Sequence, residues 1–436
     1  MGQVTTMLGE LLKIFPRYEF EKLEKQHQSN HYTKYYTGWQ QLVTLFYAQI
    51  GGHDSLRAIQ TSLCVHKEKW YHLGLTNIKR STLSDAMKNR PHQIYEGLFY
   101  KLLDKCRSVT PDHKFRFKNP LFSMDATVID LCLSVFPWAE FRQRKGAIKL
   151  HYLYDHRGSL PAFMVMTDGK HHDVRVARSE EKLDFHLLPD SIISFDRAYI
   201  DFEWLYTLDQ RRVWFVTRSK SNIQYRIIGQ HQPITNKQVT RDEKIELVID
   251  KSRAKYPKPF RLVCYTDPKT GKAYEFITNN MTLAASTIAA IYKSRWQIEL
   301  FFKWIKQNLK IKSFLGTSQN AVLTQIWVAM CYYLLLSYIK FQTKYRHSLQ
   351  ELTRMIAAVL MEHRLLIDIL SLKEQSLKKV RDPVSQLALV SRPEDFHLQT
   401  LAKLSVSIST HSASIIQPSE DIPLASVQTY PALLWP

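Results

Sequence analysis

The chain has 436 residues, and its 60 Lys and Arg outnumber its 40 Asp and Glu, so its formal net charge is +20. This length allows two to four domains with a sizeable core, and the positive excess favours a polyanionic partner, nucleic acid first, over basicity that serves solubility alone. The five cysteines occur singly without a Cys-x-x-Cys pair, which argues against a disulfide framework or a cysteine-based zinc site and is typical of the cytosol.

The first 115 residues are predicted to be helical. Apolar residues recur at helical spacing from Trp39 to Ile50, and Gly51-Gly52 ends this helix. Asp54 or Ser55 is positioned to cap the helix that follows. The start of the chain lacks the charged first residues and the apolar core of a signal peptide, which agrees with a cytoplasmic protein.

A further helix of this region is expected between Thr82 and Pro91. It begins with Thr82-Leu-Ser-Asp85, which resembles a capping box with Asp in place of the usual Glu or Gln. Arg80, Lys88 and Arg90 surround this helix. Two short helices around a Gly-containing turn with basic flanks suit a helix-turn-helix-like DNA reader. A helical bundle with a solvated basic face fits the same pattern.

The pattern changes near residue 120, and residues 116–220 are predicted to alternate strands and helices. The expected strands are Leu121–Val135, a hairpin of Lys149–Asp155 and Leu160–Met166, Ile192–Asp196, and Val213–Thr217. The expected helices are Val174–Phe185 and Phe202–Gln210. Three strands, a helix, a strand, a helix and a strand is the order of a ribonuclease-H-like (RNase H-like) core. The sequence therefore predicts a mixed α/β fold.

This core is predicted to be interrupted and then completed. Residues 221–272 are polar with short alternating patches, which indicates a β-rich insertion subdomain. Residues 273–345 are expected to return to the core with one more strand and long helices. Residues 346–436 are expected to form a C-terminal helical region and a poorly ordered tail, whose role the sequence does not indicate.

One apolar run, Ala321–Ile339, approaches the length of a membrane-spanning helix. Thr324, Gln325 and Ser337 interrupt the run, and Lys340 bounds it. A buried core helix explains these features better than a membrane span, so no membrane partner is expected.

Three acids far apart in the sequence are candidates for a shared site. Asp125 lies in an apolar strand, Asp196 ends another, and Glu299 lies in a helix that is apolar on most sides. Clustered carboxylates repel and take up protons unless cations neutralise them. Oxygen ligands without Cys or His suit Mg²⁺ or Mn²⁺, and two such ions promote phosphodiester displacement. In the ordinary alternative, each acid is a local hydrogen-bonding or ion-pairing residue.

The helix of Glu299 carries further polar residues on the same side. At about 100° per residue, Tyr292, Arg295, Glu299 and Lys306 fall within one narrow arc of a continuous helix. Buried charges of this kind are costly unless they are paired or bound to ions. We therefore expect this stripe to face partners from elsewhere in the fold, namely the two aspartates.

These residues resemble the signature of a known family. Tyr-x2-Arg-x3-Glu-x6-Lys, here Tyr292, Arg295, Glu299 and Lys306, is similar to the Y-R-E-K signature of bacterial insertion-sequence transposases of the DDE type, the insertion-sequence-four family. Ser123-Met-Asp-Ala-Thr127 resembles the strand of the family's first aspartate. The resemblance extends over roughly residues 35–345 and includes Phe195-Asp-Arg-Ala-Tyr199 around the second aspartate.

The resemblance implies a cut-and-paste DNA transposase. Such a protein has an RNase H-like core with a β-rich insertion and an N-terminal helical DNA-binding domain. It acts as a homodimer on paired terminal inverted repeats and joins 3′-hydroxyl ends to target DNA. Asp125, Asp196 and Glu299 are then the catalytic and metal-binding residues, with Mg²⁺ or Mn²⁺, two ions, as the cofactor. Tyr292, Arg295 and Lys306 are then DNA-binding residues, in agreement with the phosphate affinity of Arg and Lys.

Two alternatives and one mechanistic step stay open. A metal-dependent RNase H-like nuclease, or a non-catalytic DNA-binding protein derived from a transposase, has the same fold and charge. Some relatives pass through a DNA hairpin in which an aromatic residue of the insertion stacks on a flipped base. No Trp lies between residues 220 and 280, and the sequence singles out none of the tyrosines there, which are Tyr225, Tyr256, Tyr265 and Tyr274.

Overall fold

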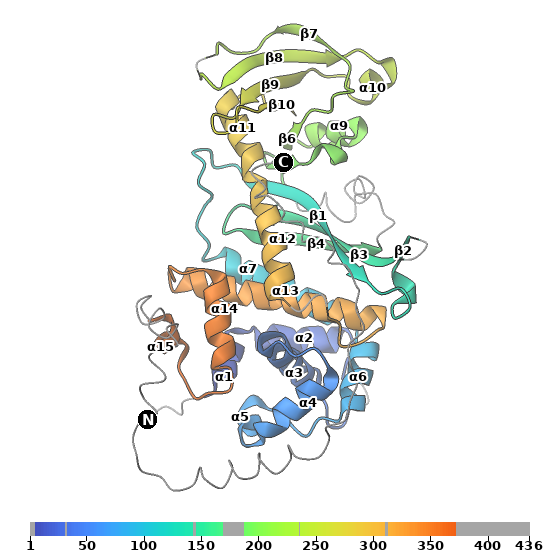
Figure 1. Ribbon diagram of the computed structural model, residues 1–436, viewed down its shortest axis with the longest axis vertical. Coiled ribbons are helices and arrows are strands. Elements are labelled where there is room, and N and C mark those ends of the chain that lie inside the picture. Colours follow the sequence, from blue (N-terminus) through green and yellow to red (C-terminus); the bar gives the residue numbers. More distant parts are fainter. Residues whose placement is uncertain are drawn as a thin grey trace, which may run out of the picture. The chain divides into compact units, whose positions relative to one another are not determined.

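The structure is a computed structural model and describes residues 5–30, 33–142, 145–168, 187–234, 236–309 and 313–371. The compact unit of Met1–Ser371 is the part considered below (Figure 1). The helix expected at 174–185 and the tail from residue 372 lie outside the described residues.

Helices make up the region before residue 115, as predicted. They are α1 (Met7–Ile14), α2 (Arg17–Gln26), α3 (Gly38–Gly51), α4 (Leu56–Val65), the 3₁₀ turn η1 (Lys67–Lys69), α5 (Trp70–Leu73), α6 (Arg80–Asn89) and α7 (Gln93–Arg107). Gly52 ends α3 in the left-handed conformation at φ 72°. The hydroxyl of Ser55 accepts a hydrogen bond from the amide of Ala58 and caps α4.

The predicted capping box at Thr82 is wrong. Helix α6 begins two residues earlier, at Arg80, and its N-cap residue Lys79 makes no side-chain cap. The carbonyl of Lys79 already accepts the amide of Leu83, so Thr82 lies within the first turn. Burial of Leu83 fixes the helix here, and this packing outweighs the local capping preference of Thr82.

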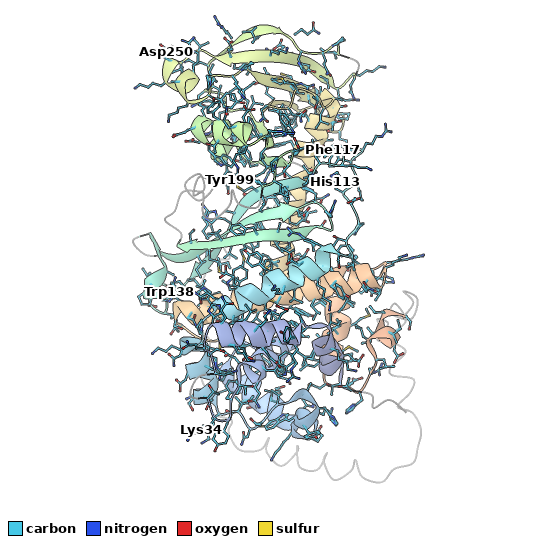
Figure 2. The ribbon with its side chains drawn as sticks, turned by 180° about the vertical axis from the view of Figure 1, so that it is seen from behind. Lys34, His113, Phe117, Trp138, Tyr199 and Asp250 are labelled. Carbon is cyan, nitrogen blue, oxygen red and sulfur yellow. The ribbon has the colours of Figure 1, made fainter. Side chains whose placement is uncertain are left out.

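The segment that leads from α7 to the sheet is held by aromatic side chains. The ring centroids of His113 and Phe117 are 5.0 Å apart (Figure 2). Phe115 stacks on Phe117 at the same distance of 5.0 Å. His113 Nε2 also lies 2.8 Å from the carbonyl oxygen of Asn119, just before the first strand. These contacts define where the chain enters the sheet.

A single ten-stranded sheet forms the other part of the unit (Figure 1). Its strands are β1 (Leu121–Leu131), β2 (Glu140–Arg142), β3 (Lys145–Asp155), β4 (Leu160–Asp168), β5 (Ile192–Phe195), β6 (Trp214–Arg218), β7 (Tyr225–Gln230), β8 (Val239–Leu247), β9 (Phe260–Thr266) and β10 (Ala273–Thr278). The order is β2-β3-β1-β5-β6-β10-β9-β8-β7, and β4 also pairs with β3. The predicted strands and the β3–β4 hairpin are thus present.

Strand direction divides this sheet. Strand β3 is antiparallel to both β1 and β4. By contrast, β5 pairs in parallel with β1 on one side and with β6 on the other. All the pairs from β6 to β7 are antiparallel. The strands of the expected insertion therefore extend the central sheet through β10 instead of forming a sheet of their own. Helix α9 (Phe202–Gln210) packs against β6, and helix α10 (Asp250–Lys255) packs against β8 and α9.

Helix α13 (Gln319–Gln342) is the centre of the main hydrophobic core. It packs against α3, α6 and α7 and against α14 (Leu349–Ala358). Its length and mean hydropathy of 1.6 would suit a membrane span, but 89% of the apolar window is buried inside the protein. The prediction of a buried core helix is therefore confirmed. Beyond α14, helix α15 (Leu366–Leu370) contacts α1.

The two faces of the sheet belong to two different cores. On β3, Tyr152 and Tyr154 pack into the core that contains α13, whereas the intervening Leu153 packs into a second core with α9. Strand β1 alternates in the same way, because Phe122 and Met124 belong to the second core. Asp125 must therefore point to the opposite face, the one that contacts helix α12 (Trp296–Asn308).

Candidate active site and metal centre

The sheet places the two candidate aspartates on neighbouring strands. The parallel register of β1 and β5 pairs Met124 with Phe195. Asp125 and Asp196 are the residues that come directly after this last pair. The register therefore places the two aspartates side by side. This placement requires the fold, because the two residues are far apart in the sequence.

Asp196 directly follows β5 and starts a new turn. Its Oδ1 accepts a hydrogen bond of 2.9 Å from the amide of Ala198, which caps the 3₁₀ turn Arg197–Tyr199. The carboxylate keeps a second oxygen for other partners, and the residue is only partly buried. It is thus fixed in direction and still accessible.

The predicted single helix around Glu299 is two helices, α11 (Ala285–Ser294) and α12, which meet at Arg295. The amide of Arg295 bonds to the carbonyl of Tyr292, and the amide of Ile298 bonds to the carbonyl of Arg295, so both bonds span three residues. The hydroxyl of Ser294 also donates to the carbonyl of Ile291 at 2.7 Å. A Ser that bonds backwards in this way competes with the helix and bends it. The expected single helix is therefore interrupted at Arg295, although Arg295 keeps helical dihedral angles of φ −52° and ψ −31°.

Arg295 nevertheless joins two of the three predicted acids. Its Nη1 lies 2.8 Å from Asp125 Oδ2 and 3.3 Å from Glu299 Oε1. The Arg295 side chain is only 8% exposed, and its Nε has no hydrogen-bond partner. The charge of Asp196 also acts on Arg295 and on Tyr292. The structure therefore gathers Asp125 and Glu299 directly around one guanidinium, with Asp196 close enough to interact electrostatically.

The electrostatics of Asp125 are unusual for an aspartate. The pKa of its carboxyl is raised to about 7, because burial and the nearby Glu299 raise it by more than Arg295 lowers it. The same acids raise the pKa of the Arg295 guanidinium, although burial opposes them. A carboxyl group that is both buried and next to another acid is stabilised as an anion by added positive charge. The single guanidinium provides only part of this charge.

The donor set fits a hard divalent cation. Asp125, Asp196 and Glu299 offer carboxylate oxygens, the ligands that Mg²⁺ and Mn²⁺ prefer. Across the described ranges, however, no three His, Cys, Asp or Glu residues already form a compact metal-binding group. Arg295 lies between two of the carboxylates, so a cation that bridges Asp125 and Glu299 requires this guanidinium to move.

Tyr292 and Lys306 lie on either side of this centre along the two helices. The Tyr292 ring packs on Phe276 of β10, with ring centroids 4.9 Å apart, and burial raises the pKa of its hydroxyl. The hydroxyl is therefore a stable hydrogen-bond donor. Lys306 is in the last turn of α12, two helical turns beyond Glu299 on the same side.

A buried hydrogen-bond network behind the acids was not predicted. Ser123 Oγ lies 2.7 Å from His156 Nε2 and 2.8 Å from Ser194 Oγ. Burial lowers the pKa of His156 to about 4, so its ring is neutral. The network ties β1 to β5 just before their aspartates.

A signal for this network was present in the sequence. The strands read Ser123-Met-Asp125 and Ser194-Phe-Asp196, and period-two alternation puts each serine on the same face as its aspartate. No comparable pattern indicated His156, because its approach depends on the β3–β4 turn.

Comparisons with known proteins bear on both halves of the chain. The family described as transposase DDE domain matches residues 116–335, and a domain of unknown function, DUF4372, matches residues 3–76. A probable transposase for insertion sequence element IS5377 from Geobacillus stearothermophilus is 32% identical over 276 residues, which cover 62% of this chain and 70% of that protein. A putative transposase, y4zB, from Sinorhizobium fredii is 31% identical over 258 residues, which cover 58% of this chain and 69% of that protein.

Among the solved structures to which the chain is also similar is a transposase complex. It is the cryo-EM structure of a piggyBac transposase synaptic complex with hairpin DNA, which aligns over 95% of this chain and 86% of that chain with 11% sequence identity and a TM-score of 0.44.

Proposed function

The chain belongs to the family of transposases with a DDE domain, and from this premise we propose that it is the transposase of an insertion sequence that binds terminal inverted repeats. It cuts at the element ends and joins the 3′-hydroxyl ends to target DNA. The observation that carries this proposal is the convergence of Asp125 and Glu299 on Arg295, beside Asp196. We further assign the chain to the insertion-sequence-four family by its Tyr292, Arg295, Glu299 and Lys306.

The catalytic core in this proposal is RNase H-like. The order β4-β3-β1-β5-β6, three antiparallel strands followed by two parallel ones, supports this assignment. Asp125 lies within β1 and Asp196 directly follows the adjacent parallel strand β5, and helix α12, which carries Glu299, contacts β1. This arrangement supports the proposal, since such a core requires its three acids near one another.

In the proposed reaction, Asp125, Asp196 and Glu299 would hold two Mg²⁺ or Mn²⁺ ions. Such ions supply activation of a water or a 3′-hydroxyl and stabilise the leaving oxygen in phosphodiester displacement. Arg295 balances the charge of Asp125 and Glu299 before cations and DNA arrive, and afterwards its guanidinium is available to a phosphate. The Tyr292 hydroxyl donates to a phosphate oxygen, and Lys306 neutralises a further phosphate along α12.

The remaining features of the proposal concern assembly and location. Two copies act together, since paired ends require two active sites. The enzyme is cytoplasmic and acts at the nucleoid. The net charge of +20 supports binding to double-stranded DNA.

The test uses purified protein and a labelled duplex that ends in the repeat flanking the gene. We expect nicking at the repeat boundary that depends on Mg²⁺ or Mn²⁺. Glu299→Gln should abolish cleavage with little loss of DNA affinity, while the exposed control Glu362→Gln should cleave normally. Cutting of any duplex irrespective of sequence would favour a nuclease. Binding without cleavage in either metal would favour a non-catalytic protein and overturn the proposal.

A further inference from the structure

Helix α6 presents a polar face that the fold leaves uncovered. Its buried residues, Leu83, Ala86 and Met87, lie on one side of the helix, which packs against α4 and α13. The opposite side is exposed and consists of short polar or charged side chains. These residues are Arg80, Ser81, Thr82, Ser84, Asp85, Lys88 and Asn89.

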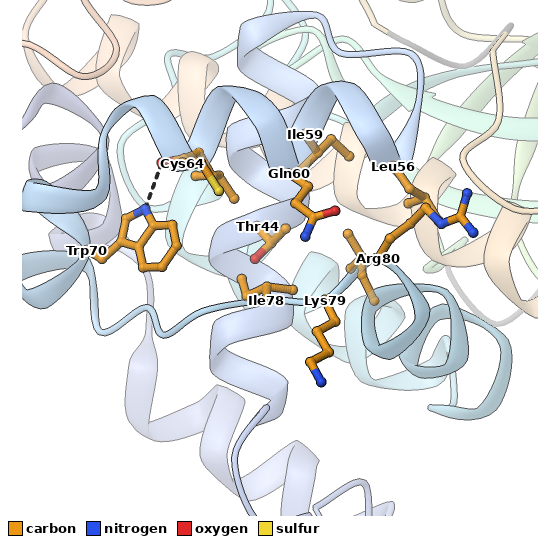
Figure 3. A pocket seen from close by; sticks show the side chains of 11 residues that line it. Thr44, Leu56, Ile59, Gln60, Cys64, Trp70, Ile78, Lys79 and Arg80 are labelled. Atoms are coloured by element: carbon orange, nitrogen blue, oxygen red, sulfur yellow. Dashed lines mark hydrogen bonds between the residues drawn. The ribbon is translucent and has the colours of Figure 1, made fainter.

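The contact with α4 is tight, so α6 is held in a fixed position. Figure 3 shows the apolar seam, to which α4 contributes Ile59 and the chain before α6 contributes Ile78. The seam leaves about 10 Å³ of open space, room for about one water molecule. The end of Lys79 extends away from it, whereas the side chain of Arg80 runs toward Leu56 at the start of α4 (Figure 3). A helix with one rigidly packed side and one exposed polar side is suited to insertion into a partner.

Positive charge gathers where α6 begins. Lys79 and Arg80 are exposed there, and Lys88 is exposed in the last turn of the helix. Within the described part of the chain, none of these three cations forms an ion pair. The helix contains a single acid, Asp85, so its net charge is positive. The helix start has no side-chain cap, so its first amides add to the positive potential. This face is complementary to an anion.

The same helix borders an open groove of about 910 Å³. Thr82, Asp85 and Asn89 line one side, and Lys34 and Tyr35 line the other. Tyr35 is 81% exposed, and Lys34 stands out at the surface (Figure 2).

The groove has a firm wall at Arg90. This side chain is only 9% exposed, and its Nη1 donates to the carbonyl of Thr37 and to Gln41 Oε1, both at 3.0 Å. The groove is wide, polar and basic at its edges, unlike the enclosed apolar pockets that bind small molecules.

We propose that α6 is the helix that enters the major groove of DNA. Ser81, Ser84, Asp85 and Lys88 recur at helical spacing along its outermost side and read base edges. Lys79 and Arg80 at the start of the helix, together with Lys34 across the groove, contact the flanking phosphates. This inference rests on the proposed function and deepens it, because it assigns recognition of the repeat to one face of α6. Helix α6 begins just after residues 3–76, which match a domain of unknown function.

The experiment measures the binding of the full chain, in EDTA, to two labelled duplexes. One carries the repeat that flanks the gene, and the other is a scrambled sequence of the same length and composition. For the double variant S84A/K88A we expect the preference for the repeat to fall roughly tenfold or more, because a base contact contributes about 1–3 kcal/mol of discrimination. Binding to the scrambled duplex should change far less.

The phosphate contacts are tested by salt dependence. Arg80→Ala should weaken binding to both duplexes by a similar factor and lower the slope of log affinity against log salt by about one. Lys67→Ala is the matched control, since Lys67 is an exposed lysine of the same helical region that does not line the groove. It should leave the slope unchanged. Circular dichroism checks that each variant is folded, and all four substituted positions are exposed.

The outcomes separate the two proposals. If the wild-type chain binds both duplexes equally, the proposed recognition of terminal repeats fails, and base reading by α6 fails with it. The salt slope on the scrambled duplex still tests α6 as a DNA-contacting helix. An unchanged slope in Arg80→Ala, or an intact preference for the repeat in S84A/K88A, overturns the inference about α6 while leaving the proposed function in place.

Discussion

The fold contains two buried arginines that each pair with an aspartate but differ in how completely they are hydrogen-bonded. Arg261 lies on β9 in the extended part of the sheet, and Arg295 lies between α11 and α12. Arg261 is fully buried, and its Nε and Nη2 each lie 2.8 Å from an oxygen of Asp242. Its Nη1 also donates to the carbonyls of Asn280 and Leu283, which join β10 to α11. Every nitrogen therefore has a partner.

Arg295 is almost as buried, but it is poorly satisfied. It contacts Asp125 and Glu299 through a single nitrogen, and its Nε has no partner. A closed network such as that of Arg261 stabilises one conformation. An incomplete one retains capacity for a ligand, so we interpret the first centre as structural and the second as functional.

The largest effect is expected at the structural centre. Asp242→Ala leaves the buried Arg261 charge without its partner, and the free energy of unfolding should fall by about 3–5 kcal/mol. Urea denaturation measures this change. Glu246→Ala, which removes the exposed pair of Glu246 and Arg226, is the control and should cost less than about 1 kcal/mol. Equal effects of the two substitutions would contradict the structural role assigned to the Asp242–Arg261 pair.

At the functional centre, cations should stabilise the protein. Mg²⁺ or Mn²⁺ at a hundred times its dissociation constant adds about 2.7 kcal/mol to the stability of the folded state, which appears as a higher melting temperature. Asp125→Asn should lose most of this shift and should itself change stability little, because it removes a buried charge whose pKa is already raised to about 7. A full metal-induced shift in Asp125→Asn would contradict the assignment of this site.

Acid should weaken the network behind the aspartates. Burial lowers the pKa of His156 to about 4 from its ordinary value near 6.5, so the unfolded chain binds a proton more readily than the folded one. Stability is therefore lost as the pH falls from about 6.5 towards 4, by about 2 kcal/mol between pH 7 and pH 5. Urea midpoints at the two pH values measure the loss. His156→Gln should show a smaller dependence on pH, and an identical dependence would exclude this histidine as the cause.

The smallest effect is expected at Lys306, two turns along α12 from Glu299. Lys306→Ala should weaken binding to the element end and lower the slope of log affinity against log salt by about one. Cleavage at saturating protein should persist, since the acids are unchanged. The affinity for an end-containing duplex, measured over a range of salt concentrations, gives the slope. A slope equal to that of the wild type would place Lys306 away from the DNA.

Local features of the fold could be predicted from the sequence. The helix ended by Gly52, the helix capped by Ser55, the β3–β4 hairpin and the strand that leads to Asp196 were all expected from nearby residues. The start of α6 and the break at Arg295 were not. Both depend on competition between a local preference and packing or hydrogen bonding of the chain around it.

By itself, the sequence determined which residue types were available: a basic chain with three acids in apolar surroundings and a helix rich in charged side chains. Only the tertiary structure decided that β1 and β5 are neighbours in parallel register, and that Arg295 contacts Asp125 across 170 positions of the chain. The physical reason is range. Caps, turns and alternation act over a few residues, whereas strand order and the meeting of buried charges result from how the hydrophobic cores of the whole unit pack.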